Sequence, residues 1–242
     1  MEWRDEGLVV GVRTYGETSV ILDLFTAGRG RHAGLVQGGR SRRLRPLLQP
    51  GNSLVATWRA RTEDQLGSFV VEPLRLRAGQ MMESGMALHA LNHLCALLRL
   101  LPEREAHPDL HEAVELMVDR IEEPRLFPVL LVRFELQVLA DLGFGLDLAR
   151  CGATGRTDDL TFVSPRTGRA ITREAGEPYR DRILPLPELL RTPGASAGAP
   201  TSEIRAAFRV TEHFLQRDLF GPRGLAVPLD RLAYLSAALP AE

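Results

Sequence analysis

The feature that most constrains the fold is a series of short β-rich segments, separated by turns, in the first third of the chain. The five candidate strands are residues 7–13, 18–25, 31–37, 53–59 and 68–72. Gly16 and its neighbours form the first turn, and residues 42–49 are predicted to form a short helix after the third strand. This layout predicts a small closed β-domain at the start of the chain.

Five strands with one helix after the third predict an OB-fold, a Greek-key barrel that often binds single-stranded nucleic acid. An SH3-like barrel has a similar number of strands, and the length and helix position favour the OB-fold. The barrel aromatics Tyr15, Phe25, Trp58 and Phe69 are candidates for stacking on bases. The alternative for each of them is a place in the barrel core.

A stretch of arginines without any acid lies between residues 29 and 45 of this predicted barrel. All 30 basic residues of the chain are arginines, whose planar guanidinium can bind phosphate with two hydrogen bonds. Gly38 and Gly39 precede Arg40, and glycines allow backbone amides to approach a phosphate closely. We therefore expect sequence-independent, salt-sensitive DNA binding here, the alternative being a solvated loop with no partner. The candidate DNA-binding residues are Arg29, Arg31, Arg40, Arg42, Arg43 and Arg45.

The charge distribution also separates the first third from the rest. The net charge is −1 over 242 residues. Residues 1–80 carry 12 arginines against 8 acids, whereas residues 81–150 carry 6 against 12. A basic segment followed by an acidic one indicates separate domains with separate partners.

The remainder of the chain is predicted to be mainly helical. Apolar residues recur at helical spacing over residues 81–101, 109–121, 127–142, 203–219 and 229–239, with Ser202 as a candidate N-cap. Residues 151–182 read as turns and short strands, and residues 192–202 as a low-complexity loop. The expected domains are 1–78 (barrel), 79–150 (helical bundle), 151–190 (small β-insert) and 201–242 (C-terminal helices packing on the bundle).

Several classes of protein are not favoured. There is no P-loop, no Gly-x-Ser-x-Gly and no cluster of metal ligands, and Asp158-Asp159 reads as part of a turn, so no catalytic residues are expected. Cys95 and Cys151 are far apart, which favours a reducing compartment and a cytoplasmic protein. No apolar run is long enough to span a bilayer, so no membrane association is expected.

The order of several short motifs resembles the RecO family of recombination mediators. The barrel motifs are Gly-Leu-Val-Val-Gly-Val-Arg at residues 7–13, Tyr-Gly-Glu at 15–17, Gly30-Arg31 and Gly38-Gly39-Arg40. The later motifs are Arg133-Phe134-Glu135, residues 142–147, Cys151, residues 164–168 and residues 184–187. The resemblance covers almost the whole chain and implies an α+β multidomain protein, with an N-terminal OB-fold β-barrel followed by an α-helical domain.

The resemblance also implies a small β-insert, which in many members holds zinc through four cysteines. Here Cys151 matches the first ligand, but Thr154 stands at the second position, and the second pair falls near Thr172 and Ala175. One thiolate cannot complete a tetrahedral zinc site, so we expect no metal and no cofactor, and the insert to be a zinc-finger remnant.

What the resemblance implies about function is DNA repair without catalysis. The family binds single- and double-stranded DNA, anneals complementary strands, and acts with RecR to load recombinase on strands coated by single-strand binding protein. It also docks the acidic-hydrophobic tail of that protein on its helical domain, for which Arg133, Leu136, Leu142 and Phe144 are the candidate residues. For Arg133 an ion pair within the domain is the alternative. The protein is expected in the cytoplasm, at the nucleoid during repair. A protein-only adaptor is the alternative function.

Overall fold

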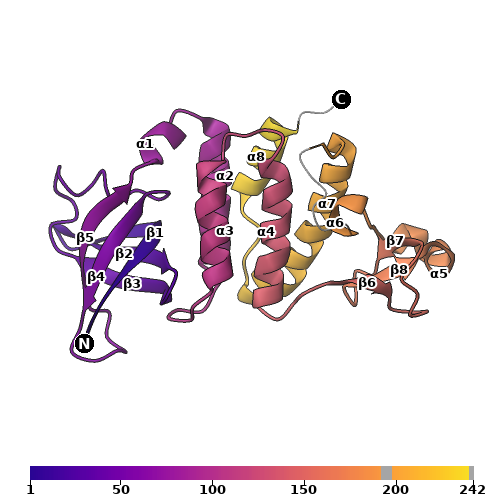
Figure 1. The fold of residues 1–242 in the computed structure, drawn as a ribbon, viewed down its shortest axis with the longest axis horizontal. Helices are drawn as coiled ribbons and strands as arrows, with labels where there is room; N and C mark the ends of the chain where they lie inside the picture. The colour runs from indigo at the N-terminus through magenta and orange to yellow at the C-terminus, as the bar shows by residue number, and fades with distance from the viewer. Residues whose placement is uncertain (192–197, 240–242) are drawn as a thin grey trace. The chain divides into compact units, whose positions relative to one another are not determined.

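The computed structural model describes residues 1–191 and 198–239 and divides into two compact units, Met1–Ile121 and Glu122–Glu242 (Figure 1). The expected boundary after residue 78 lies inside the first unit, because the first helices cluster with the barrel and not with the later helices. The residues expected as a bundle at 79–150 are thus divided between the two units. Most of the expected loop at residues 192–202 lies outside the described residues.

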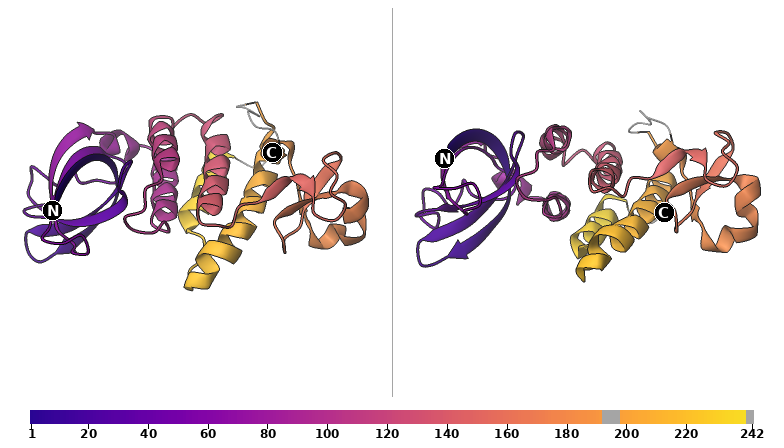
Figure 2. Two further views of the ribbon diagram at one scale, coloured as in Figure 1. Left: turned by 60° about the horizontal axis from the view of Figure 1, so that its bottom comes forward. Right: turned by 90° about the horizontal axis from the view of Figure 1, so that it is seen from below.

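The first unit begins with a closed five-stranded barrel in the order β1-β2-β3-β5-β4. Its strands are β1 (Glu2–Tyr15), β2 (Ser19–Thr26), β3 (Gly30–Val36), β4 (Ser53–Arg59) and β5 (Ser68–Arg75). All neighbours pair antiparallel except β3 and β5, which pair in parallel at Leu35 and Ser68. This order confirms the predicted OB-fold barrel, and Figure 2 shows it from two further directions.

The length of β1 closes the barrel. Residues 2–8 of this strand pair with β4 and residues 7–15 pair with β2, so one strand joins both edges of the sheet. The register shifts between Val9 and Gly11, and a bulge at that point increases the twist that closure needs. The sequence pattern located only the second half of β1, since residues 2–6 are all charged except Trp3 and contain no β-rich run.

Alternation along the strands builds the barrel core. β2 contributes Val20, Leu22 and Leu24 to the barrel core, and β4 contributes Leu54, Ala56 and Trp58. A period of two residues places such side chains on one face of a strand.

The segment after β3 differs from the prediction. Residues 37–49, called the arginine loop below, form a series of turns rather than the expected helix at 42–49. Only two bonds of helical spacing occur, from the amide of Arg45 to Ser41 and from the amide of Leu48 to Leu44. Leu48 is buried in the barrel core and so anchors this loop to the barrel.

Three helices complete the first unit: α1 (Ala78–Met81), α2 (Gly85–Leu98) and α3 (Pro108–Asp119). The expected helix at 81–101 is broken because Ser84 is extended and caps α2, accepting a hydrogen bond from the Ala87 amide. Pro108 occupies the first turn of α3, as proline prefers. Within the unit, α2 packs on β1 and α3 packs on β2.

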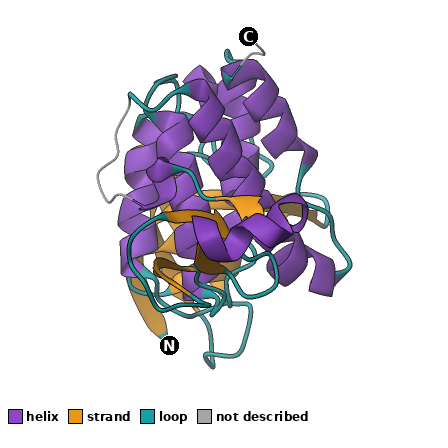
Figure 3. Ribbon diagram, turned by 90° about the vertical axis from the view of Figure 1, so that its right-hand side faces the viewer, coloured by secondary structure: helices purple, strands orange, loops and turns teal. Residues whose placement is uncertain are grey.

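The second unit is mainly helical, with one small sheet (Figure 3). Its helices are α4 (Phe127–Asp141), α5 (Arg173–Gly176), α6 (Glu188–Arg191), α7 (Thr201–Phe214) and α8 (Leu229–Ala238), with short turns of other helix types at Glu177–Arg182, Leu215–Phe220 and Gly221–Arg223. Its strands β6 (Asp147–Cys151), β7 (Leu160–Val163), β8 (Arg169–Thr172) and β9 (Leu184–Pro185) form a sheet in the order β6-β8-β7-β9. This is the predicted small β-insert.

The helix ends of the second unit follow local rules. Gly143 has a φ of +86° after α4, and the Phe144 amide donates to the Leu139 carbonyl (2.7 Å), the long bond of a Schellman C-cap. The predicted N-cap Ser202 is wrong, since α7 begins at Thr201 and Pro200 precedes it. Within the described residues, no helix combines the length and the apolar character that crossing a membrane requires.

Candidate nucleic-acid interface

The arginine stretch of the sequence does not form one patch. Arg29 lies in the turn between β2 and β3, whereas Arg40, Arg42 and Arg43 follow the other end of β3. At 3.3 Å per residue, the length of β3 separates the two groups by roughly 20 Å. The fold therefore divides the predicted DNA-binding residues between two ends of the barrel.

Arg31 is held within the protein. Its Nη1 lies 3.3 Å from an oxygen of Asp23 and 3.3 Å from one of Glu103, and its Nε donates to the Leu101 carbonyl (3.1 Å). The side chain is 17% exposed, and burial raises the pKa of Asp23 although Arg31 opposes this. Arg31 therefore fastens β3 to the segment before α3, and its donors are largely occupied.

Arg40 fixes the arginine loop to the turn between β1 and β2. Its amide donates to the Thr18 carbonyl (3.0 Å), and its Nη1 donates to the Glu17 carbonyl (2.7 Å). The Gly39 amide donates to the Val36 carbonyl (3.3 Å) and is thus engaged within the protein. Gly39 is required because a Cβ there would lie 2.5 Å from a methyl group of Val20.

Asn52 holds the other end of the loop. Its buried side chain donates to the Pro46 and Leu47 carbonyls (2.9 and 3.0 Å) and accepts from the amides of Arg77 and Ala78 (2.8 and 3.0 Å). All these bonds connect the loop to the start of α1. The loop is thus held at both ends, which limits the entropy that its arginines lose on binding a ligand.

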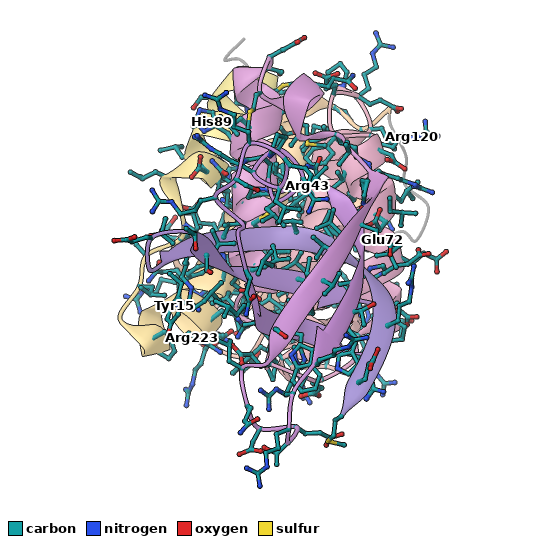
Figure 4. All side chains as sticks on the ribbon, turned by 90° about the vertical axis from the view of Figure 1, so that its left-hand side faces the viewer. Tyr15, Arg43, Glu72, His89, Arg120 and Arg223 are labelled. Atoms are coloured by element: carbon teal, nitrogen blue, oxygen red, sulfur yellow. The ribbon has the colours of Figure 1, made fainter. Side chains whose placement is uncertain are left out.

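Arg42, Arg43 and Arg45 are exposed and unpaired. Their guanidinium groups make no hydrogen bond or ion pair with any residue that the structure describes. Figure 4, which looks onto the barrel, labels Arg43 together with Tyr15.

Three other exposed arginines of the barrel are paired with acids. Arg4 pairs with Glu72 and Arg59 pairs with Glu2, both at 2.9 Å, and Arg75 pairs with Asp119 at 3.1 Å. The arginine loop thus carries three exposed arginines that have no acidic partner in the described structure.

A groove of about 340 Å³ lies between this loop and the barrel. It is lined by Val12, Thr14, Val20, Gly39, Arg40, Arg45, Leu48 and Gln49. Apolar side chains form part of its wall and two arginines stand at it, an arrangement that suits the sugar and phosphate of a strand.

Of the four aromatic candidates, only Tyr15 is available for stacking. Tyr15 is 55% exposed at the end of β1, whereas Phe25, Trp58 and Phe69 are buried. Arg13, on the same part of β1, is exposed and makes no ion pair in the described structure. The sequence reasoning missed Arg13 because it counted basic residues along the chain and not across the β1–β2 hairpin.

In the second unit, α4 does not bring all the predicted partner-binding residues together. Leu136 follows Arg133 by three residues and lies on the same side of the helix. Leu142 is about 2.5 turns and ~13 Å further along and so lies on the opposite side. Phe144 is exposed beyond the helix end, and Arg133 is half-buried and has a partner within the protein.

Glu135, the last residue of the Arg-Phe-Glu motif, is the centre of a buried network. It is 0% exposed and pairs with Arg231 (Nε to Oε1, 2.7 Å), which is 2% exposed. The Thr211 hydroxyl also donates to Glu135, and Arg231 donates to the Phe208 carbonyl (2.7 Å). This motif therefore joins α4, α7 and α8, which no local pattern could predict.

Cys151, which the resemblance matched to the first zinc ligand, is the last residue of β6 in the small sheet. The Thr172 amide donates to its sulfur (3.4 Å). Burial opposes ionisation, but hydrogen bonds from Thr154, from the Thr172 amide and from the Ala153 amide outweigh it and lower the thiol pKa to about 6. In the described residues, no three His, Cys, Asp or Glu side chains are grouped to hold a metal. The absence of zinc stays a prediction.

The paired acids Asp158 and Asp159 lie in the loop between β6 and β7. Asp158 pairs with Arg156 (2.6 Å) and Asp159 with Arg173 (3.4 Å). Two exposed carboxylates that each pair with an arginine show no geometry for acid–base catalysis.

A second groove, of about 240 Å³, was missed by the sequence reasoning. It lies between α7 and α8 and is lined by Arg205, Phe208, Arg209, Glu212, Leu232, Leu235, Ser236 and Leu239. Helical spacing on α7 places Arg205 and Arg209 one turn apart, and the sequence indicates both, with Arg217, as the alternative DNA-binding residues.

The strand order places the first unit in the OB-fold class of barrels, and sequence comparison gives the family. The family model "Recombination protein O N terminal" matches residues 1–76, and "Recombination protein O C terminal" matches residues 82–225. A DNA repair protein RecO of Methylorubrum extorquens is 52% identical over 240 residues, covering 98% of each chain. That of Methylocella silvestris is 55% identical over 237 residues, covering 98% of this chain and 95% of the relative.

The chain belongs to the RecO family of DNA repair proteins.

Proposed function

We propose that the protein is a non-catalytic recombination mediator that binds single- and double-stranded DNA, anneals complementary strands and helps to load recombinase. It acts in the cytoplasm, at the nucleoid during repair. The observation that carries the proposal is the set of unpaired, exposed arginines at Arg42, Arg43 and Arg45, on a loop that is fixed to an OB barrel. Unpaired arginines release the counterions of phosphates, and this release gives affinity without sequence preference.

Arg29, Arg31 and Arg40 have different roles in this proposal. Arg40 stands at the groove but is committed to the Glu17 carbonyl, so it contributes charge and fixes the loop. Arg31 is committed to Asp23 and Glu103. Arg29 is exposed at the end of β3 away from the arginine loop, and it contacts a different part of the bound DNA strand.

The proposed partners are RecR and the C-terminal tail of single-strand binding protein. For the tail we keep Arg133, Leu136, Leu142 and Phe144 as the proposed contacts. Because Leu142 lies opposite Arg133 on α4, a bound tail must follow the helix around its end. Replacing Arg133 with Ala should weaken binding of a labelled acidic-hydrophobic tail peptide and leave DNA binding unchanged. If the Arg133→Ala variant binds the peptide as tightly as the wild type and an Arg209→Ala variant binds it more weakly, the tail site lies in the groove between α7 and α8.

A protein-only adaptor is the alternative function. Leu229 and Leu232 on α8 are 81% and 62% exposed, and exposed leucines of this kind are typical of protein contacts. The adaptor would bind partner proteins and show no salt-dependent affinity for DNA.

Strand annealing tests the proposal. Two complementary labelled strands coated with single-strand binding protein should anneal faster with the wild-type protein than without it. An Arg42→Ala/Arg43→Ala variant should lose most of this acceleration. A double variant of paired arginines, Arg4→Ala/Arg75→Ala, removes the same charge and should retain it. Equal loss in both variants would mean that net charge, and not the arginine loop, governs annealing.

A further inference from the structure

A further cavity lies at the end of the barrel where β2 turns into β3. The length of β3 separates it from the arginine loop. Its volume is about 320 Å³, at the lower end of the range for small-ligand sites. It is lined by Met1, Glu2, Trp3, Arg29, His32, Trp58, Glu63 and Arg104. All these residues belong to the first unit.

Three rings form one wall of this cavity. Trp3 and Trp58 stack with ring centroids 5.8 Å apart and an angle of 18° between their planes. The His32 ring stands edge-on to both, with centroids 5.0 Å away and angles of 83° and 77°. Trp58 and His32 are buried beneath this wall, and Trp3, which is partly exposed, offers flat apolar surface to a planar ligand.

His32 is the unexplained group in this wall. It is 4% exposed, and neither ring nitrogen has a hydrogen-bond partner in the described structure. Buried polar groups are nearly always paired, so two unpaired nitrogens beside a cavity indicate a ligand that supplies the partners.

The protonation state of His32 limits what that ligand is. Burial and the nearby charge of Arg104 lower the pKa of His32 to about 4. The ring is therefore neutral at physiological pH and offers one donor and one acceptor. The edge of a nucleobase carries both kinds of group.

Charged groups surround the opening. Arg29 is exposed, and its guanidinium group has no partner among the described residues. Arg104 is fixed by bonds from its Nη2 to the carbonyls of Asp64 and Gln65 (3.3 and 3.1 Å), which leave its other donors free. Two guanidinium groups at the mouth suit a phosphate.

We propose that this cavity is a nucleotide site, in which an unstacked base packs against Trp3, over the buried rings of Trp58 and His32, while its phosphate pairs with Arg29 and Arg104. When the nucleotide is part of a DNA strand, this proposal rests on the proposed function, DNA binding, and adds a binding site for one base. The arginine loop then holds the backbone, and the cavity holds one base of the same strand at a distance set by β3.

The chain contains its own probe for this site. Trp3 and Trp58 are the only two tryptophans, and both line the cavity, so tryptophan emission reports its occupancy. The experiment measures two signals for one labelled single-stranded oligonucleotide: its anisotropy for binding anywhere, and tryptophan quenching for entry into the cavity. The second arm titrates dAMP and deoxyadenosine as free ligands.

We expect saturable quenching by the oligonucleotide and by dAMP. Arg29→Ala should weaken dAMP binding about tenfold, as expected for loss of one charge-assisted hydrogen bond, and leave deoxyadenosine binding unchanged. His32→Phe, which keeps a ring in the wall, should weaken both free ligands. Quenching by dAMP without quenching by the strand would assign the site to free nucleotides and overturn its role on DNA.

The two proposals fail differently. Strand binding by anisotropy with no change in tryptophan emission, by the strand or by either free ligand, would overturn the nucleotide site and leave DNA binding in place. If the anisotropy of the labelled oligonucleotide does not rise on adding the protein, the strand does not bind, and the proposed function is overturned. Equal dAMP affinity in Arg29→Ala, His32→Phe and the wild type would show that the quenching arises outside the cavity.

Discussion

The buried pair of Glu135 and Arg231 should make the second unit depend strongly on one arginine. Arg231→Met keeps most of the side-chain volume but leaves the Glu135 carboxylate buried without the guanidinium that neutralises its charge. Removing one partner of a buried ion pair costs about 3–5 kcal/mol in free energy of unfolding. For a unit of this size, such a loss lowers the melting temperature by roughly 10 °C or more.

Urea denaturation followed by circular dichroism of the helices measures this loss. The control Arg156→Ala removes an arginine whose pair with Asp158 is exposed, and it should leave the unfolding midpoint where it is. Replacing both partners, in Glu135→Leu/Arg231→Met, should recover much of the stability, because no buried charge is then left unpaired. A cost below about 1 kcal/mol for Arg231→Met would refute the reasoning. So would a double variant as unstable as the single one.

Three further outcomes are expected. Gly30→Ala should destabilise the first unit far more than Gly38→Ala. Both glycines have a positive φ, but only at Gly30 would an added Cβ lie 1.7 Å from a backbone oxygen. The midpoint of urea unfolding, followed by tryptophan emission, measures the difference. The pKa of His32 is lowered to about 4 in the folded state, so the free energy of unfolding should fall as the pH drops from about 6.5 towards 4, by up to about 1.4 kcal/mol per pH unit. The His32→Phe variant should lose this part of the pH dependence. An unchanged pH dependence in the variant would contradict the buried neutral ring. Ultraviolet titration should show the Cys151 thiolate forming near pH 6, while Cys95, whose pKa burial raises to about 12, stays protonated. Metal analysis should find no bound zinc, and one zinc ion per chain would contradict the single-thiol site.

Local pattern predicted the elements well and their partners poorly. The alternation in β2 and β4 was visible because each strand carries its own period of two residues. The arginine loop was mistaken for a helix at 42–49, since its fold depends on Asn52 and on the core position of Leu48, and neither contact has a signal at helical spacing.

The candidate site shows the same division. Arg42, Arg43 and Arg45 are exposed, as their position in a polar loop suggested. Arg31 looks equivalent in sequence, but its partner Glu103 is 72 residues away and nothing near Arg31 indicates the pair. His32 belonged to the same basic stretch, yet strand alternation turns it into the barrel interior, where it becomes part of an aromatic wall.

The domain boundary depended on packing between helices and barrel. The helices α2 and α3 carry apolar faces that pack on β1 and β2, so they cluster with the barrel. Helical periodicity shows that a face is apolar and does not show which surface will cover it.

The central claim is that the unpaired arginines of the arginine loop hold the phosphates of DNA. The most direct test is the salt dependence of oligonucleotide affinity, measured by fluorescence anisotropy for the wild type, Arg42→Ala/Arg43→Ala and the paired-arginine control Arg4→Ala/Arg75→Ala. We predict that the slope of log affinity against log salt decreases by about 1.4 in the loop variant, about 0.7 for each lost phosphate contact on a single strand, and is unchanged in the control. Equal slopes in the wild type and the loop variant would contradict the account and place the phosphate contacts elsewhere on the protein.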